Sequence, residues 1–453
     1  MRYTLHNAVI VTGASSRRGA LVIDNGRIAA IRYEEPFLLG SPYADGTAVD
    51  LQGRFLFAGG IDAHVHFREP GLTHKGDIAS ESRAALLGGI TAFIDMPNTI
   101  PPATTQERLL EKCRLAAGRS WCHYAFHRGA ANDVSSIQTT DFQPVPGISP
   151  ALKVFLGSST GNLLVNDPAT LEAIFRQSET PVFVHSEDET IIRANLAAAR
   201  QRFGDGIPIA WHPQIRSREA CIASTRRAID AALRFGTHLH ILHVSTEEEA
   251  ELIRTAKGYS PHITAETGAH YLWFCDEDYE RLGMRIRCNP AIKTARDREA
   301  LIAAVRDGTI DTLGSDHAPH LLSEKERPYL EAPSGIPSIQ ESLSVLLTVT
   351  RRNGIPATRV ASLISERIAD ILRIEGRGHL VPGNAADLIV VDPDAVWTVG
   401  KPTCKCGWSP FEGETLTGRI DQVWLAGVPI VSAGRLLSPI PAGQPLRFRS
   451  PAD

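Results

Sequence analysis

The sequence has little of several features that mark other classes of protein. Lys and Arg number 47 against 51 Asp and Glu, a formal net charge of −4, so no basic excess points to nucleic acid or to an anionic membrane. No apolar run approaches the length that crosses a bilayer, and "MRYTLHNAVIVTG" lacks the basic-then-apolar pattern of a secretory signal. We therefore expect a cytoplasmic protein that binds neither nucleic acid nor membrane.

Cysteine is also scarce, with seven scattered residues among 453. An odd and dispersed set is typical of reduced thiols and not of a disulfide framework. Cys404 and Cys406 have the spacing of half a zinc site, but no second pair lies near them in the sequence. Two thiols in a loop are therefore the favoured interpretation.

What the chain does have is two distinct patterns of apolar residues. The first occupies residues 1–53 and 381–453, where short apolar runs are separated by Gly and Asn-Gly turns, the usual signal of β-hairpins. Neither end has enough strands for a stable sheet of its own. We predict that the two ends pair into one small β-sandwich domain.

Residues 54–380 follow the second pattern, in which apolar runs alternate with helix-like segments. Segments such as "REACIASTRRAIDAALRFG" place apolar residues at helical spacing and end in glycine. Roughly eight such repeats predict an α/β fold, a (β/α)8 TIM-type barrel. An open doubly wound sheet is the alternative.

Polar side chains occupy the ends of these apolar runs, where the strands of a barrel carry catalytic residues. Alternate residues of a strand face the same side, so the two histidines of "DAHVHF" can reach one metal ion together. Each side chain alone has an ordinary structural interpretation, but six of them at the ends of strands that share one mouth indicate a metal centre. The six candidate ligands are His64, His66, Lys153, His185, His243 and Asp316.

This ligand set is too large for one tetrahedral zinc ion and suits two ions a few ångströms apart. A lysine bridges two cations only after it has captured carbon dioxide as a carbamate, which presents two anionic oxygens. Burial favours the neutral amine that this capture needs. The sequence thus predicts two Zn²⁺ ions bridged by carboxylated Lys153 and a hydroxide, with an ordinary lysine paired to a carboxylate such as Glu187 as the alternative.

The motifs "DAHVHFREPG", "DMPNT", "LKVFLG", "VHSED", "LHVST", "NPAIK" and "SDHAPH" resemble those of the amidohydrolase superfamily, and within it those of the longer, bacterial type of dihydroorotase. "PGNAADLIVVDP" and "SPFEGETLTGRI" are similar to the composite β domain that these enzymes carry, so the resemblance covers nearly the whole chain. It implies the reversible, zinc-dependent cyclisation of N-carbamoyl-L-aspartate to L-dihydroorotate, a step of de novo pyrimidine biosynthesis.

The resemblance also implies roles for individual ligands. His64, His66 and Asp316 would bind the more buried zinc ion, and Asp316 would also act as the catalytic residue that transfers a proton. His185 and His243 would bind the second ion, and carboxylated Lys153 would bridge the two.

Four further residues are implied to contact the substrate. Arg68, Asn98 and His320 would hold its carboxylate, and Asn289 with the backbone of residues 332–335 would contact the pyrimidine ring. One departure from the family pattern is "TAETGAHYL", where relatives often have Pro-His before the histidine that matches His270, so no role is assigned to that residue.

Other cyclic amidohydrolases are the rival interpretation. Allantoinases usually lack an arginine at the position of Arg68, and hydantoinases usually have threonine where this chain has Val65. A non-catalytic, dihydroorotase-like assembly partner is a further alternative, but such homologues lack metal-site residues that are all present here. The resemblance implies a small-molecule substrate, with a homodimer and an association with aspartate transcarbamoylase as candidate assemblies.

Overall fold

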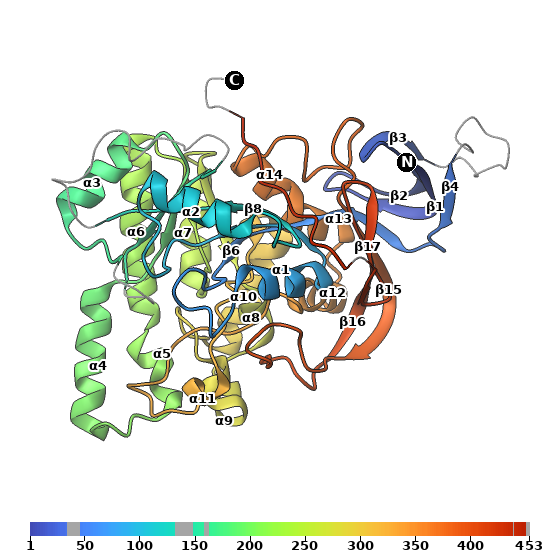
Figure 1. Ribbon diagram of the computed structural model, residues 1–453. Helices are drawn as coiled ribbons and strands as arrows, with labels where there is room; N and C mark the ends of the chain where they lie inside the picture. The colour runs from blue at the N-terminus through green and yellow to red at the C-terminus, as the bar shows by residue number, and fades with distance from the viewer. Residues whose placement is uncertain (34–45, 132–147, 158–162, 438, 450–453) are drawn as a thin grey trace.

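The computed structural model describes residues 1–33, 46–131, 148–157, 163–437 and 439–449. It contains a barrel of parallel strands wrapped by helices and, beside it, a sheet built from both ends of the chain (Figure 1). Within the described residues, no helix is both long enough and apolar enough to cross a membrane.

The barrel is built from short parallel strands that are buried along their whole length. In chain order they are β6 (Gly60–Val65), β7 (Ile90–Asp95), β8 (His123–Phe126), β9 (Arg128–Gly129), β10 (Leu152–Phe155), β11 (Val182–His185), β12 (Leu239–Ile241), β13 (Ile263–Thr267) and β14 (Thr312–Leu313). Burial on both faces of the sheet explains why these segments are continuous apolar runs in the sequence.

The strands form a closed ring. β6, β7 and β8 pair in one run and β9 to β14 in another, and only His127 separates β8 from β9, so the two act as one strand. At the other junction Val65 pairs with His317 in parallel, and the His66 amide donates to the His317 carbonyl at 2.8 Å. Closure in the described part of the chain confirms the (β/α)8 barrel and excludes the open sheet.

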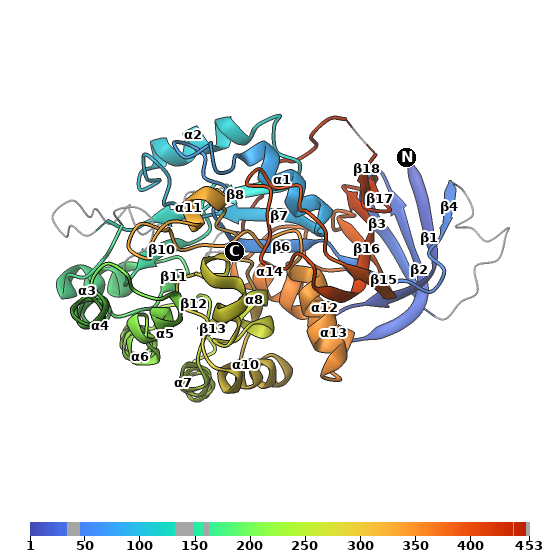
Figure 2. The same cartoon turned by 90° about the horizontal axis from the view of Figure 1, so that it is seen from below.

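Helices cover the outside of the barrel, and Figure 2 shows α3, α6, α7 and α10 around the strands. The helices are α1 (Ile78–Leu87), α2 (Gln106–Ala116), α3 (Pro168–Gln177), α4 (Glu189–Phe203), α5 (His212–Ile215), α6 (Arg218–Phe235), α7 (Glu247–Lys257), α8 (Ala269–Trp273), α9 (Asp278–Leu282), α10 (Ala295–Asp307), α11 (Leu322–Lys325), α12 (Ser342–Arg352), α13 (Ala357–Ala361) and α14 (Arg367–Ile371), with single turns η2 (Ile209–Trp211), η3 (Gly283–Ile286) and η4 (Ser362–Glu366).

The ends of these helices follow from local sequence. The Thr246 hydroxyl accepts the Glu249 amide at 3.1 Å and starts α7, as expected of an N-cap threonine. Helix α6 stops at Gly236, which has φ 73°, a left-handed conformation that glycine adopts without strain. The helical pattern read from the sequence is confirmed in α6 over its whole length.

The sheet beside the barrel contains strands from both chain ends. They are β1 (Arg2–Val11), β2 (Ser16–Asp24), β3 (Arg27–Tyr33), β4 (Thr47–Asp50), β5 (Phe55–Ala58), β15 (Leu388–Thr398), β16 (Thr415–Leu425), β17 (Val428–Ser432) and β18 (Arg435–Leu436). Their order is β18-β17-β16-β15-β5-β1-β2-β3, with β4 beside β1. β5 joins the two ends, because it pairs with β15 on one side and with β1 on the other.

The position of β5 bears on the domain boundary. The strand lies at residues 55–58, which the sequence pattern grouped with the barrel, yet its partners are strands of the end sheet. We propose that the first boundary falls at Gly59, between β5 and β6. The Gly59 amide donates to the Asp387 carbonyl at 2.8 Å, which holds this crossing point against the start of β15.

Candidate metal centre

The six predicted ligands come from five strands and converge at one end of the barrel. His64 and His66 lie at the end of β6, Lys153 in β10, His185 at the end of β11, His243 just after β12 and Asp316 just after β14. They line a single cavity of about 370 Å³ together with Arg68, Asn98, Phe155, Asn289, Ala318, Ser334 and Gly335.

Three residues of this cavity have a left-handed backbone. Arg68, His243 and Asp316 have φ values of 67°, 39° and 46°. A side chain larger than glycine costs about 1–3 kcal/mol there and persists only where the surrounding structure holds it. Residues with such strained backbones cluster at functional sites, so three of them in one cavity support the interpretation of this cavity as a functional site.

The first group of ligand atoms has the spacing of a shared ion. Nε2 of His64 and Nε2 of His66 lie 3.2 and 3.1 Å from Oδ1 of Asp316, and the three atoms lie within 4.8 Å of one another. Ligand atoms at about 2.0–2.1 Å from a tetrahedral zinc ion are about 3.3 Å apart. His64, His66 and Asp316 therefore fit one metal ion.

Charge in this first group also suits a cation. Burial alone would raise the pKa of Asp316, but the adjacent imidazoles of His64 and His66 hold it well below its ordinary value. Burial lowers the pKa of His66 to about 4. The carboxylate is thus ionised and the imidazole of His66 neutral, which are the forms that bind metal.

The second group consists of His185 and His243. Nδ1 of His185 lies 2.9 Å from Nε2 of His243, and Nε2 of His185 donates to Oε2 of Glu187 at 2.9 Å. With that proton on Nε2, Nδ1 of His185 offers a lone pair toward His243. Burial lowers the pKa of both histidines, so both imidazoles are neutral and able to share one ion.

Lys153 stands beside these groups without a polar partner. Its buried Nζ has no hydrogen-bond partner in the described residues and lies 4.6 Å from the centroid of the Phe155 ring. Glu187, the alternative partner considered above, is instead held by His185 and Arg216. Burial lowers the pKa of Lys153 to about 7, so a large share of the amine is uncharged near neutral pH.

The two groups adjoin one another. The ring centroids of His64 and His243 are 5.3 Å apart, and those of His185 and His243 are 4.7 Å apart. His64 and His243 therefore form the boundary between the groups, and ions bound on the two sides of that boundary would lie a few ångströms apart, as in two-metal hydrolytic sites.

Hydrogen bonds behind the first group orient its imidazoles. Nδ1 of His64 donates to Oε1 of Glu266 at 2.6 Å, and Nδ1 of His66 donates to Oδ1 of Asn98 at 2.7 Å. Both Nε2 lone pairs consequently turn toward Asp316. Glu266, in β13, was not predicted from the sequence, although a carboxylate inside the buried run "HITAETGAH" was a signal for it.

We expect Glu266→Ala to weaken metal binding about 10- to 100-fold, the usual effect of losing a carboxylate that orients a ligand. Glu266→Gln keeps an acceptor for His64 and should lose less. Competition with a chromophoric chelator measures the affinity, and Glu280→Ala on the exposed surface of α9 is the control. Unchanged affinity in Glu266→Ala would show that His64 does not bind the metal.

Positive charge gathers at one edge of the cavity. Nε of Arg68 donates to the Pro319 carbonyl at 3.1 Å, and its Nη2 lies 3.0 Å from Nε2 of His320. Nζ of Lys75, which also pairs with Glu324 at 3.0 Å, lies 3.0 Å from Nδ1 of His320. Lys75 was not predicted from the sequence.

The charge of this edge resides on Arg68 and Lys75. Burial and the charges of these two residues hold the pKa of His320 well below its ordinary value, so its imidazole is neutral. His320 lies behind Arg68 and is not among the residues that line the cavity. The guanidinium is therefore the cation that a ligand in the cavity would meet.

Two other residues named from the sequence differ in their surroundings. Asn289 lines the cavity, and its buried Oδ1 has no hydrogen-bond partner in the described part of the chain. His270 is fully buried, does not line the cavity, and both of its ring nitrogens lack a partner there as well. Asn289 thus has an acceptor to offer a ligand in the cavity.

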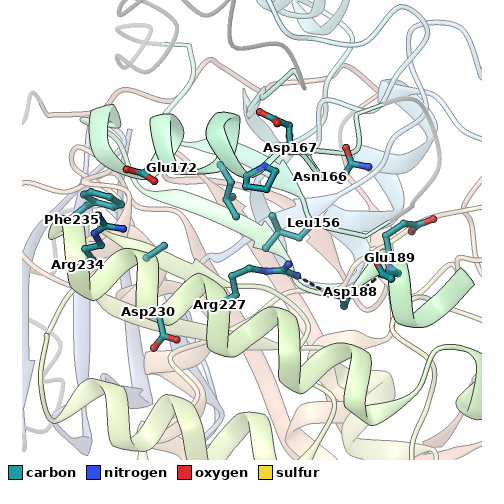
Figure 3. Close-up of a pocket in the computed structure, with 15 residues that line it drawn as sticks. Leu156, Asn166, Asp167, Glu172, Asp188, Glu189, Arg227, Asp230, Arg234 and Phe235 are labelled. Carbon is teal, nitrogen blue, oxygen red and sulfur yellow. Dashed lines mark hydrogen bonds and ion pairs between the residues drawn. The ribbon is translucent and has the colours of Figure 1, made fainter. Parts of the chain in front are cut away.

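A larger hollow of about 970 Å³ lies elsewhere, between α3 and α6 (Figure 3). None of the predicted site residues lines it. Two of its acidic side chains serve local structure: Asp188 accepts the first amides of α4 and pairs with Arg227 at 2.7 Å, and Asp167 accepts the Thr170 amide. Size alone therefore does not mark it as the site of chemistry.

Known proteins resemble this chain over most of its length. The model of the amidohydrolase family matches residues 55–430. The dihydroorotase of Methanosarcina acetivorans is 30% identical over 439 residues, which cover 93% of this chain and 91% of that protein. The allantoinase of Deinococcus radiodurans is 30% identical over 455 residues, 98% of both chains.

Solved structures share the fold. The L-hydantoinase (dihydropyrimidinase) of Arthrobacter aurescens superposes with a TM-score of 0.91 at 26% identity, over 98% of this chain and 99% of that one. The relatives thus act on several cyclic amides, and similarity alone does not choose among their substrates.

Proposed function

Because the chain belongs to the amidohydrolase family and is a cyclic amide hydrolase, we propose that it is a dihydroorotase. It interconverts N-carbamoyl-L-aspartate and L-dihydroorotate in pyrimidine biosynthesis. The observation that carries this proposal is the buried guanidinium of Arg68 at the edge of the metal cavity. Dihydroorotate has a carboxylate to match it, whereas the rings of hydantoin and allantoin are neutral.

The proposed cofactor is a pair of zinc ions bridged by carboxylated Lys153. The two adjoining ligand groups and the buried, unpartnered amine between cavity residues support it. When bound, two zinc ions supply an acidified water as nucleophile and polarise the carbonyl that it attacks.

The residues of the chain bind and orient the substrate around that chemistry. Arg68 holds the carboxylate through two N–H donors, which fixes the ring in one orientation. Oδ1 of Asn289 accepts an N–H of the ring. Asp316 takes the proton of the nucleophile on a carboxylate oxygen and delivers it to the departing ring nitrogen.

A substrate panel tests the assignment. The purified protein is assayed with L-dihydroorotate, allantoin, hydantoin and dihydrouracil, and its zinc content is measured on the same preparation. We expect dihydroorotate to give by far the highest kcat/KM and about two zinc ions per chain. Faster turnover of a neutral ring would overturn the substrate assignment, and a zinc-free protein inactive on all four would favour a non-catalytic assembly partner.

The equilibrium of the reaction should depend on pH in a definite direction. Ring closure converts a dianion to a monoanion and consumes one proton, so the ratio of dihydroorotate to carbamoyl aspartate should rise about tenfold for each unit that the pH falls, while both carboxylates stay ionised. Chromatography of mixtures approached from both sides measures this ratio. A composition that does not change between acidic and alkaline buffers is incompatible with the proposed reaction.

The proposal extends to the setting of the enzyme. Seven cysteines without a disulfide in the described residues are typical of a reducing compartment, which supports the cytoplasm. A homodimer and an association with aspartate transcarbamoylase stay predictions, and size-exclusion chromatography of the protein with and without that enzyme tests both.

A further inference from the structure

Two cysteines face each other in the loop that joins β15 to β16. Sγ of Cys404 and Sγ of Cys406 are 3.5 Å apart, and each lies 3.8 Å from the carbonyl oxygen of Trp408. Among the described residues, no third His, Cys, Asp or Glu joins the two sulfurs in a metal-binding group. The half-site for zinc that the spacing suggested is therefore not completed.

We propose that Cys404 and Cys406 are a redox modification site, at which an intrachain disulfide forms reversibly and lowers the activity of the metal centre. A disulfide needs the sulfurs at about 2.05 Å, so they must approach by about 1.5 Å. Cys406 is partly exposed, whereas Cys404 is buried. A reagent can therefore reach the sulfur of Cys406 first, and Cys404 reacts with Cys406 afterwards.

The oxidant is a low-molecular-weight disulfide. The thiolate of Cys406 attacks one of its sulfurs, the S–S bond of the reagent breaks, and one small thiol leaves. Cys404 then attacks Sγ of Cys406, which forms the intrachain bond and releases the second small thiol. Two electrons pass from the cysteines to the reagent, and their two protons end on the released thiols.

The chemistry of Cys404 supports this order of events. Its hydrogen bond with Cys406 and its burial both raise the pKa of the Cys404 thiol well above the ordinary value. Cys406 therefore reacts first, and Cys404 loses its proton only for the second step, after the mixed disulfide on Cys406 has removed that hydrogen bond. The thiolate, and not the thiol, is the nucleophile in each step.

The loop is tied to the metal cavity at two points. Nε1 of Trp408 donates to the carbonyl of His320 at 2.8 Å, and His320 contacts Arg68. The amide of Lys405, between the two cysteines, donates to Oε1 of Glu81 at 3.0 Å.

Glu81 connects the second of these contacts to the metal cavity, because its Oε2 is 2.7 Å from Nε2 of His317, the neighbour of Asp316. Drawing the sulfurs together displaces the peptide of Lys405 and the backbone that carries Trp408. The hydrogen bonds then shift His320, which contacts Arg68, and His317, which is next to Asp316. A shift of about 1 Å in such groups costs up to about 100-fold in rate.

The test uses the full-length, metal-loaded protein and oxidised glutathione. We expect the titratable thiols to fall from seven by two, the mass to fall by about 2 Da, and a peptide map to show Cys404 linked to Cys406. We expect kcat/KM to fall about 10- to 100-fold and to recover with dithiothreitol. Reagent that stays as a mixed disulfide, or a mapped bond that leaves kcat/KM unchanged, overturns the proposal.

Serine variants supply the controls. Cys404→Ser and Cys406→Ser should keep the basal activity and lose the response to oxidised glutathione, whereas Cys113→Ser, a partly exposed cysteine on α2, should respond as the wild type does. If a serine variant does not fold, the peptide map of the wild-type protein still decides whether the bond forms. The activity readout rests on the proposed function; a wild-type enzyme that turns over another cyclic amide refutes that function, and the redox test then uses that amide.

Discussion

Replacing Lys153 with methionine is expected to remove at least one of two zinc ions and to reduce kcat by more than about 100-fold. A loss of about 100-fold is the largest that usually follows from removing a residue that only orients a metal ligand, and Lys153 is proposed to bind the metal directly. Two cations a few ångströms apart repel one another, and an anionic bridge offsets much of that repulsion. Methionine has a similar length but cannot form the bridge. Metal analysis and steady-state assays measure both losses.

Chemical rescue sharpens this expectation. A small carboxylic acid added to Lys153→Met should enter the space left by the carbamate and restore part of the zinc and part of the activity. In an experimental structure of the wild type, density should continue beyond Nζ into a planar group. A methionine variant with two zinc ions and full activity would refute the bridge.

A matched pair of variants separates metal loss from misfolding. Nζ of Lys153 is buried without a polar partner, so Lys153→Met should leave the thermal stability of the metal-free protein unchanged or higher. Lys112 is also buried, but it is 2.5 Å from Asp95. Lys112→Met leaves that carboxylate uncompensated and should lower the free energy of unfolding by about 3–5 kcal/mol.

The second large effect is expected from Arg68→Met. Losing one partner of a buried charged contact costs about 2–5 kcal/mol, which corresponds to a fall of about 30- to 5,000-fold in kcat/KM for dihydroorotate. Zinc content should not change, because Arg68 is assigned to the substrate and not to the metal. Hydrolysis of a neutral ring such as hydantoin should change little.

The contrast between charged and neutral rings makes this prediction specific. Arg193→Met, on the exposed face of α4, serves as a control for removing an arginine. Equal losses on charged and neutral rings would mean that Arg68 supports the metal centre generally. Near-normal kcat/KM for dihydroorotate would mean that its carboxylate binds elsewhere.

The barrel and the positions of the six predicted ligands followed from local patterns. A buried parallel strand appears in the sequence as a short apolar run. In a barrel, the polar residue at the C-terminal end of each such run lies at the same mouth, whichever strand it belongs to. His64, His185 and His243 were predicted as ligands in this way, because only the end of each apolar run had to be recognised. Their convergence then required only that the strands form one ring.

Contacts between residues that are distant in the sequence left no such pattern. Glu266 orients His64 from another strand, and Lys75 contacts His320 across 245 positions in the sequence. Neither pairing has a spacing that a single chain reveals, because only the closure of the barrel creates the contact. The same holds for β5, whose partner β15 lies at the other end of the chain.

The pairing of β5 with β15 also governs the order in which the molecule can be completed. β5 ends at Ala58 and β15 begins at Leu388, and a ribosome that adds about 5–20 residues per second needs about 20–70 s to make the chain between them. During that interval β1 is already available to one edge of β5, but the edge that will pair with β15 has no partner, and an open strand edge invites pairing with other chains. The time needed to synthesise the chain between β5 and β15 therefore sets how long this edge of each new molecule is open to pairing with other chains.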